Sequence, residues 1–436
     1  MHNHNDNAAE VDYLDQAAFI SQISDAIKNS IPPKGIAING YWGTGKTSAL
    51  ILLHKKLTGV LPTESYKNEN KEIMTVWFEA WRYQNETQPI VALLQEIRKN
   101  FTIWNSFLDK SEKLSGILLQ GVIGAFDEVL KNASGGFMSP SLGKIPKIAE
   151  KWEKDHYETP LTSQDLTKLM EEAIEKALGN NERKLVIFID DLDRCMPETA
   201  LKLLEGIKLY LNLKQCIIVF GMDQRQIENS LHIALKIKDN LNDSDDHARE
   251  YLEKICQDIF HLPIIDQTKK KNYLISLLRD LELNDYHIDE LEKCLNVFDC
   301  LPANPRKIKS LANRLAFMLK RLENLTSDIN KFHIQNLNRF HGILICVAII
   351  YTFHRRLNEQ LAKNPIYINH VIIFARKPLS NISDKMFEPM ATIKPSMNED
   401  TELPTNPSDS NVFRLHALLI ELDTISIDEI KPLLNL

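Results

Sequence analysis

The chain has 436 residues, with 52 lysines and arginines against 59 aspartates and glutamates, so its formal net charge is −7. This length accommodates two or three domains and at least one large hydrophobic core. With only 15 glycines and 18 prolines, and with 44% hydrophobic residues, it is not collagen-like, low-complexity or fully disordered. The acidic total excludes a protein that coats nucleic acid over its whole surface but leaves room for a local basic face.

The cysteines and the apolar segments indicate a cytoplasmic protein. The six cysteines form no C-x-x-C pair and lie mostly in apolar or helical runs, so we expect free thiols rather than disulfides or zinc ligands. The first residues have no apolar core and do not resemble a signal peptide. The longest apolar stretch, 342–353, is too short to span a bilayer, and we expect a buried helix there.

Strands and helices alternate in the first part of the chain. Strand-like apolar runs occur at 35–39, 73–78, 185–189 and 216–220. Helical periods surround them, at 11–30, 47–57, 88–101, 166–178 and 197–211. This alternation predicts an α/β fold, in which helices cover both faces of a parallel sheet.

The predicted domains follow from the same pattern. We expect an α/β core over 12–265, with a helical insertion over 102–165 that contains no strand-like run. A disordered tail is expected over 1–11. The rest of the chain has a nearly continuous helical period, which predicts a helical lid over 266–325 and a helical C-terminal domain over 326–436.

The segment 40–47, Gly-Tyr-Trp-Gly-Thr-Gly-Lys-Thr, fits the phosphate-binding pattern G-x-x-x-x-G-K-[ST]. Glycines at this spacing let backbone N–H groups point at phosphate oxygens, and the following helix N-terminus adds its positive dipole end. Lys46 is expected to reach the β- and γ-phosphates, and the Thr47 hydroxyl to ligate Mg²⁺. A predicted strand before the segment and a helix after it favour this interpretation over a chance glycine-rich turn. The expected nucleotide-binding residues are Gly40, Trp42, Gly43, Thr44, Gly45, Lys46, Thr47 and Ser48.

A cluster of acidic residues follows the strand-like run 185–189. Asp190 stands at its end, where the carboxylate that holds Mg²⁺ is expected. Asp191 is the expected residue for orienting the attacking water, although its side chain is shorter than the glutamate of many ATPases, and Asp193 is the competing candidate. The alternative is that these carboxylates cap the helix that begins at Pro197.

Three motifs resemble the KAP family of P-loop NTPases. They are GYWGTGKTS at 40–48, VWFEAWRYQ at 76–84 and VIFIDDLDRC at 186–195, and the segments 251–263 and 304–315 are similar to later motifs of that family. The resemblance covers about residues 12–320. It implies an additional-strand ATPase fold, oligomerisation and, in bacteria, a frequent association with mobile elements and defence against phage.

The sequence departs from the family pattern at one motif position and in its insertion. Glu79 stands where the family usually has asparagine, so no polar role is carried over to it, while Trp77, Phe78 and Trp81 are expected to pack against the strand. Many members insert transmembrane helices between the two nucleotide motifs. The apolar runs of the insertion in this chain are too short to span a membrane.

Three further side chains are candidates for sensing or stabilising the γ-phosphate. Asp223 follows the run 216–220, whose strand is expected beside that of Asp190, and it either senses hydrolysis or caps the next helix. Arg194 and Arg225 either neutralise transition-state charge, in this chain or in a neighbouring subunit, or form ordinary salt bridges.

Six cations share one face of a helix predicted over 301–322, opposite an apolar face: Arg306, Lys307, Lys309, Arg314, Lys320 and Arg321. Arg306 reaches the γ-phosphate from the lid, as the Pro-Arg motif of the resembled family suggests, or the face binds nucleic-acid phosphates. In a third interpretation the face is solvated or pairs with the acidic stretch 239–258. Phe317 lies on the basic side as a candidate stacking residue.

Together these observations predict a P-loop ATPase that uses MgATP to drive conformational and oligomeric switching. The resemblance to the KAP family implies in addition a place in a bacterial anti-phage system. ATP is expected because no guanine-reading N-K-x-D element is present. The expected partners are further copies of the chain or other subunits of the same system. The alternatives are a scaffolding module that holds nucleotide with little turnover, and a nucleic-acid-associated ATPase.

Overall fold

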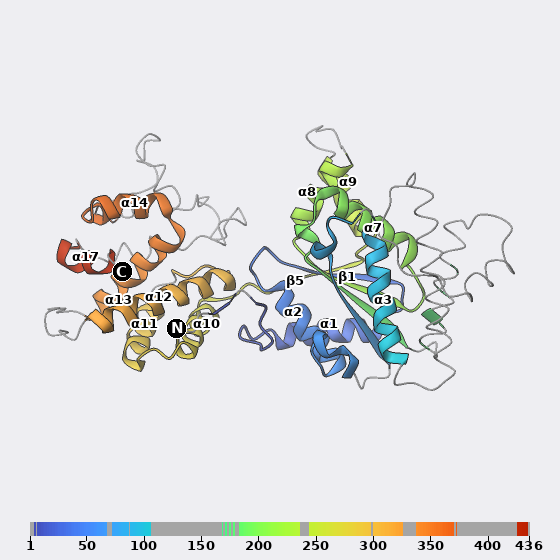
Figure 1. Ribbon diagram of the computed structural model, residues 1–436, viewed down its shortest axis with the longest axis horizontal. Coiled ribbons are helices and arrows are strands. Elements are labelled where there is room, and N and C mark those ends of the chain that lie inside the picture. The colour runs from blue at the N-terminus through green and yellow to red at the C-terminus, as the bar shows by residue number, and fades with distance from the viewer. Residues whose placement is uncertain are drawn as a thin grey trace.

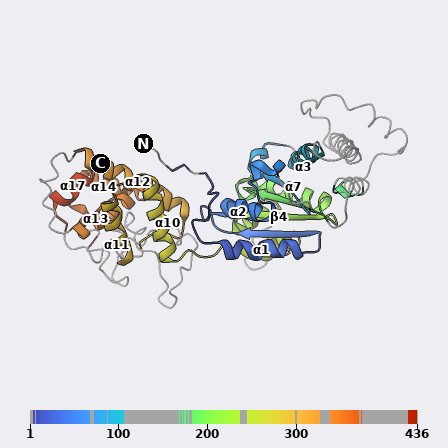
Figure 2. The ribbon, with the colours of Figure 1, turned by 90° about the horizontal axis from the view of Figure 1, so that it is seen from below.

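The protein is described from a computed structural model, in which an α/β part and an all-helical part lie side by side (Figures 1 and 2). The structure describes residues 4–5, 7–67, 72–86, 88–105, 183–235, 244–297, 300–325, 337–369 and 425–434, with single positions at 168, 171, 174, 175, 178 and 372. Apart from 102–105, the predicted insertion lies outside the described residues.

A five-stranded parallel sheet forms the centre of the α/β part, as predicted (Figure 1). Its spatial order is β2-β3-β4-β1-β5, so β4 separates β1, which precedes the phosphate loop, from β3, which ends in Asp190. This is the additional-strand arrangement. The strands are β1 (Lys34–Asn39), β2 (Ile73–Glu79), β3 (Lys184–Asp190), β4 (Cys216–Met222) and β5 (Asp258–His261).

Helices cover both faces of the sheet, because parallel strands are joined by crossover connections. Successive side chains of β3 alternate between two buried clusters: Val186 and Phe188 pack towards one face, and Ile187 and Ile189 towards the other. The first face is covered by α1 (Ala17–Asn29) and α2 (Lys46–Thr58). The second is covered by α3 (Pro89–Asn105), α7 (Pro197–Tyr210), α8 (Gln224–Ala234) and α9 (Ser244–Glu253).

Two sequence predictions for this part need correction. The helix predicted over 11–30 begins only at Ala17, because the Asp12 carboxylate accepts hydrogen bonds from the backbone N–H groups of Leu14 and Gln16 and holds this segment in a turn. The strand β5 was not predicted. It is four residues long and only partly buried, so it lacks the apolar run that marks the other four strands.

The all-helical part has one continuous hydrophobic core. Its described helices are α10 (Gln267–Asp280), α11 (Asp285–Val297), α12 (Pro305–Leu325), α13 (Leu337–Phe353), α14 (Arg355–Lys363) and α17 (Ile427–Leu434). The core contains residues of the predicted lid and of the predicted C-terminal domain, so the two regions pack as one body. The apolar stretch at 342–353 lies in α13, whose residues 343–350 are buried, as predicted.

Among the described residues, no single helix is long and apolar enough to cross a membrane. Only α13 and α14 taken together meet that requirement, and they are bent by 118° relative to each other.

A substitution at Gly35 tests the packing of β1 against the segment that precedes β5. A Cβ atom there would lie 1.9 Å from the carbonyl oxygen of Ile255, and a backbone atom cannot rotate away. We expect Gly35→Ala to lower the free energy of unfolding by about 3 kcal/mol, measured by urea denaturation. Gly59→Ala is the control, since Gly59 has a φ of +79° and nothing within 4 Å, and its expected loss is about 1 kcal/mol. Equal losses of unfolding free energy in the two variants would contradict the close contact of Gly35 with the Ile255 backbone.

Candidate nucleotide-binding site

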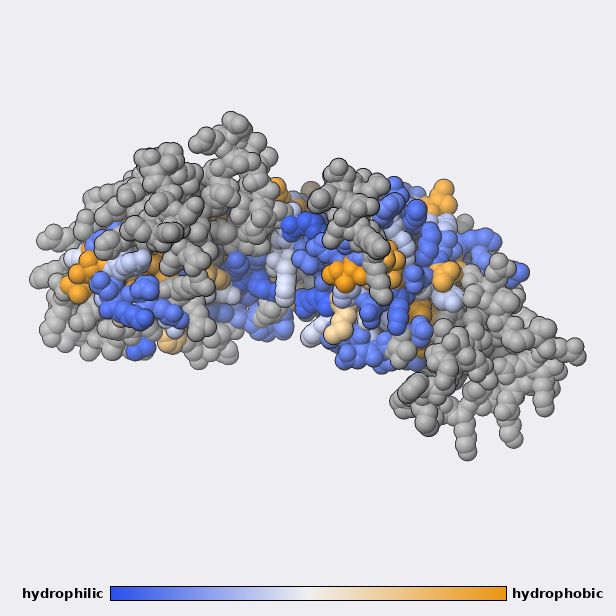
Figure 3. Space-filling view, turned by 90° about the horizontal axis from the view of Figure 1, so that it is seen from above, coloured by the Kyte–Doolittle hydropathy of each residue, from blue (hydrophilic) through white to orange (hydrophobic). Residues whose placement is uncertain are grey.

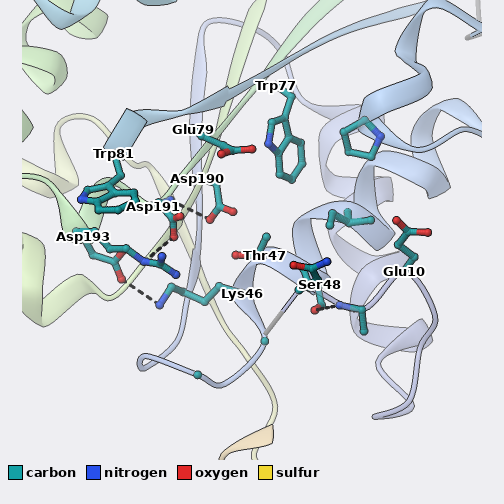
Figure 4. Close-up of a pocket in the computed structure, with 18 of the residues that line it drawn as sticks. Glu10, Lys46, Thr47, Ser48, Trp77, Glu79, Trp81, Asp190, Asp191 and Asp193 are labelled. Atoms are coloured by element: carbon teal, nitrogen blue, oxygen red, sulfur yellow. Dashed lines mark hydrogen bonds and ion pairs between the residues drawn. The ribbon is translucent and has the colours of Figure 1, made fainter. Parts of the chain in front are cut away.

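A cavity of about 1450 Å³ opens at the carboxyl ends of the strands, where ligands of open parallel sheets bind (Figure 4). It brings together the predicted phosphate loop, the three aspartates after β3, Asp223 and Arg306. Residues 7–10 also line it. The segments that carry these side chains are distant in sequence, and the topology of the sheet places them around one cavity.

The loop between β1 and α2 has the backbone conformation that a phosphate cradle requires. Gly43 and Gly45 have φ values of +86° and +99°, which favour glycine over other residues. Gly45 is the N-cap of α2, so the helix N-terminus faces the cavity. Lys46 is buried; its Nζ atom donates to the carbonyl oxygen of Gly40 at 2.9 Å and forms an ion pair with Asp193 at 3.0 Å.

Asp190 and Thr47 lie beside each other at the floor of the cavity (Figure 4). The Asp190 carboxylate accepts a hydrogen bond from the Thr47 hydroxyl and another from the backbone N–H of Asp191 at 2.9 Å. Burial raises the pKa of Asp190 to about 7, and the adjacent Asp191 charge acts in the same direction. One carboxylate and one hydroxyl suit Mg²⁺, which keeps several of its waters. These residues therefore fit the predicted metal site.

The two candidates for the water-orienting residue are both engaged within the protein. Asp191 has a left-handed backbone conformation, and its carboxylate pairs with Arg194 Nε at 3.0 Å. Burial raises the pKa of Asp191, and Arg194 opposes that shift. Asp193 Oδ2 contacts Lys46 and also accepts the backbone N–H of Asp223 at 2.9 Å. Asp193 therefore joins the phosphate loop to the end of β4.

Asp223 directly follows β4 and lines the cavity, as predicted from its position after the run 216–220. Its side chain is buried, and within the part of the chain that the structure describes its Oδ1 atom has no hydrogen-bond partner. Arg225 Nε lies 3.7 Å from that oxygen, and the Arg225 guanidinium stacks over the ring of Tyr41 at 4.0 Å. An unsatisfied carboxylate oxygen at this place is available to a bound ligand or water.

The helical part contacts the phosphate loop at the start of α12. Asn304 Nδ2 donates to the carbonyl oxygen of Trp42 at 2.9 Å, and the Arg306 backbone N–H donates to that of Gly43 at 3.4 Å. The guanidinium groups of Arg194 and Arg306 each lie 5.7 Å from the Trp42 ring, which is 64% exposed. Asn304 was not among the predicted site residues, although the similarity of 304–315 to a family motif includes it.

The predicted basic face of α12 is largely occupied by contacts within the protein. The predicted apolar face is buried, and Phe317 lies on the opposite, exposed side. All six cations interact with other groups of the protein. Three lie over aromatic rings: Arg306 over Trp42, Lys307 over Phe353 and Arg314 over Tyr351. Two donate hydrogen bonds to carbonyl oxygens: Lys309 to that of Asn7 and Lys320 to that of Leu281. Arg321 also takes part in an interaction. The face is therefore not a row of solvated side chains.

The described residues of the predicted tail connect the two parts. The backbone N–H of Ala9 donates to Ser48 Oγ at 2.9 Å. His4 exchanges two hydrogen bonds of 2.9 Å with the Asn313 side chain, through its backbone N–H and its carbonyl oxygen. Nothing in the polar N-terminal sequence indicated these contacts, because they depend on partners about 40 and 300 positions away.

The aromatic residues of the second motif divide between core and cavity. Trp77 stacks on Phe188 with 5.7 Å between ring centroids, and Phe78 is fully buried, as expected. Trp81 was expected to pack against the strand. It lies instead in the short helix η2 (Ala80–Tyr83), is 47% exposed and lines the cavity.

A family model of the KAP family P-loop domain matches residues 16–322. The chain belongs to the KAP family. This confirms the resemblance drawn from the motifs, and membership of a P-loop NTPase family agrees with nucleotide binding at the cavity. An uncharacterized protein of Methanocaldococcus jannaschii, MJ0182, is 27% identical to this KAP protein over 173 residues, which cover 34% of this chain and 89% of the relative.

A solved structure, that of Drosophila ORC bound to DNA, matches with 13% identity and a TM-score of 0.33. The match covers 77% of this chain and 73% of that chain. A similarity this low supports no statement about the function of the KAP protein.

The raised pKa of Asp190 predicts a stability that depends on pH. The folded protein binds the Asp190 carboxyl proton more tightly than the unfolded chain does. The free energy of unfolding therefore falls as pH rises from about 4 to 7, and above pH 7 the whole cost of burying the ionised carboxylate is present. We expect Asp190→Asn to raise that free energy at pH 8, by up to about 4 kcal/mol, and to have little effect at pH 4. Thermal unfolding without nucleotide or Mg²⁺ measures both. A gain of equal size at the two pH values would contradict this expectation.

Proposed function

We propose that this KAP protein binds and hydrolyses MgATP, and that the bound nucleotide switches the contact between α12 and the phosphate loop. The observation that carries the proposal is the arrangement of Lys46, Thr47 and Asp190 around one cavity, behind a loop with two glycines at positive φ. Charged phosphates require a cation and backbone N–H donors. This cavity supplies both.

The side chains have separable roles in this proposal. Lys46 exchanges its carboxylate partner, Asp193, for oxygens of the β- and γ-phosphates. Thr47 and Asp190 hold Mg²⁺, which neutralises charge on the phosphates. Arg194 and Arg306, at the rim beside Trp42, are the cations of this chain placed to stabilise charge that develops on the γ-phosphoryl group.

The proposed switch follows from the contacts of the phosphate loop. When Lys46 turns to a phosphate, Asp193 loses one of its two partners and keeps the backbone N–H of Asp223. At the other side of the loop, residues 42 and 43 accept hydrogen bonds from Asn304 and Arg306 of the helical part. A change in the loop therefore reaches α12 directly, and a ligand that prefers one arrangement shifts the population towards it.

Assembly and biological role extend the proposal further. Oligomeric switching and a place in a bacterial anti-phage system rest on the family resemblance. Phage challenge of cells that express the wild type or Lys46→Ala tests the anti-phage role. Nucleic-acid binding is not included, because five of the six α12 cations contact the protein itself.

Substitution of Lys46 tests the central claim. We expect Lys46→Ala to weaken ATP binding and to lower ATP hydrolysis at least 100-fold, because the buried cation that faces the phosphates is lost. Binding of a fluorescent ATP analogue and release of inorganic phosphate measure the two effects. Lys56→Ala, an exposed lysine on the same helix, is the control and should match the wild type. Hydrolysis by Lys46→Ala at the wild-type rate would refute the proposal, and tight binding by a wild type without turnover would support the scaffolding alternative.

Hydrogen exchange tests the switch. We expect a non-hydrolysable ATP analogue, compared with ADP, to change amide exchange at 304–309, because this segment is hydrogen-bonded to the phosphate loop. Exchange in α17, which does not line the cavity, should stay the same. Identical exchange at 304–309 in both nucleotide states would contradict the proposed coupling.

A further inference from the structure

A further carboxylate lies at the carboxyl end of the sheet, from a strand whose end carries no assigned role. Glu79 is the last residue of β2 and is paired in register with Asp190 of β3. Residues paired in this way on parallel strands point to the same side of a sheet. Figure 4 shows the Glu79 carboxylate projecting into the cavity between Trp77 and Asp190.

Among the other carboxylates at this end of the sheet, those of Asp190, Asp191 and Asp193 have close partners, and the buried carboxylate of Asp223 lies 3.7 Å from Arg225 Nε. Asp190 accepts the Thr47 hydroxyl, which matches its place at the metal. Asp193 holds Lys46 and the backbone N–H of Asp223. The Asp191 carboxylate pairs with Arg194 at 3.0 Å.

Glu79 is held more loosely than these. Its Oε2 atom forms an ion pair with Arg82 Nε at 2.5 Å, and the Arg82 side chain is 69% exposed, whereas the Arg194 side chain that pairs with Asp191 is 33% exposed. Exposed ion pairs of this kind contribute little to stability because water screens them, so exchange of Arg82 for a water molecule costs little. Glu79 and Asp191 both line the cavity at this end of the sheet; burial is the main cause that raises the pKa of Asp191, and the Glu79 charge acts in the same direction.

We propose that Glu79 is the catalytic residue that orients and deprotonates the attacking water. This inference rests on the proposed ATPase function and deepens it. The water oxygen forms a bond to the γ-phosphorus, the bond from that phosphorus to the β,γ-bridging oxygen breaks, and ADP leaves with that oxygen. The water proton passes to the Glu79 carboxylate and from there to solvent. Asp191 is then a positioning residue, which holds Arg194 beside Trp42.

A neutral, isosteric substitution tests this role. We expect Glu79→Gln to keep ATP affinity within about threefold of the wild type, because the residue is not needed for binding. Its single-turnover hydrolysis should fall at least about 100-fold, because an amide cannot accept the proton. The variant should also retain unhydrolysed ATP through gel filtration, whereas the wild type carries ADP. Glu79→Asp should retain part of the rate, since a carboxylate is still present.

Arg82→Gln is the matched control. It removes the ion pair but leaves the Glu79 carboxylate in place, so its hydrolysis rate should stay within about threefold of the wild type. Circular dichroism and thermal unfolding establish that both variants are folded. Equal losses of rate in Glu79→Gln and Arg82→Gln would overturn the proposal, because the ion pair and not the base would then be what matters.

The failure of this inference is distinct from the failure of the ATPase proposal. Hydrolysis by Glu79→Gln at the wild-type rate, together with an inactive Lys46→Ala, would overturn the role of Glu79 alone. In that case Asp191→Asn should show the larger loss. A wild type that hydrolyses no ATP would overturn both.

Discussion

The buried ion pair between Lys46 and Asp193 is the interaction on which the arrangement of this cavity depends. Both side chains are less than 10% exposed, and removal of either partner would leave a buried charge without compensation. Through Asp193 the pair also includes the backbone N–H of Asp223. It thereby joins the phosphate loop after β1 to the ends of β3 and β4, so a ligand that competes for Lys46 changes three segments together.

The helical part extends this dependence beyond the sheet. The loop that holds Lys46 also accepts the hydrogen bonds of Asn304 and Arg306, and Figure 3 shows a notch between the two parts on this face of the molecule. The hydrogen bonds at the phosphate loop are among the contacts that link the parts, together with the ring contact of Tyr13 with Tyr273 and the ion pair of Asp15 with Lys269. The predicted lid shares its hydrophobic core with α13 and α17, so a movement of α12 carries the whole helical part and not a separate flap.

The features that local sequence determines were predictable. The four predicted strands are apolar runs because both faces of the sheet are buried along them. The phosphate loop follows from glycine spacing and from Lys46 and Thr47. The edge strand β5 and the turn at Asp12 were missed, since one has no apolar run and the other replaces helical hydrogen bonds with a side chain. The exposure of Trp81 was also missed, because an aromatic residue next to a strand carries the same signal whether it packs or lines a cavity.

The sequence by itself determined the fold class, the KAP motifs and the position of the glycine-rich loop with Lys46 and Thr47, because each depends on spacing over a few positions. Only the tertiary structure decided which carboxylate has which partner. Asp193 contacts Lys46, Asp191 contacts Arg194, and Glu79 joins the cavity because β2 pairs in register with β3. It also decided that the basic face of α12 and residues 4, 7 and 9 make contacts within the chain. These outcomes depend on partners far away in sequence. Amphipathic periodicity predicts which residues share a face of a helix, but it does not predict which other residues contact that face.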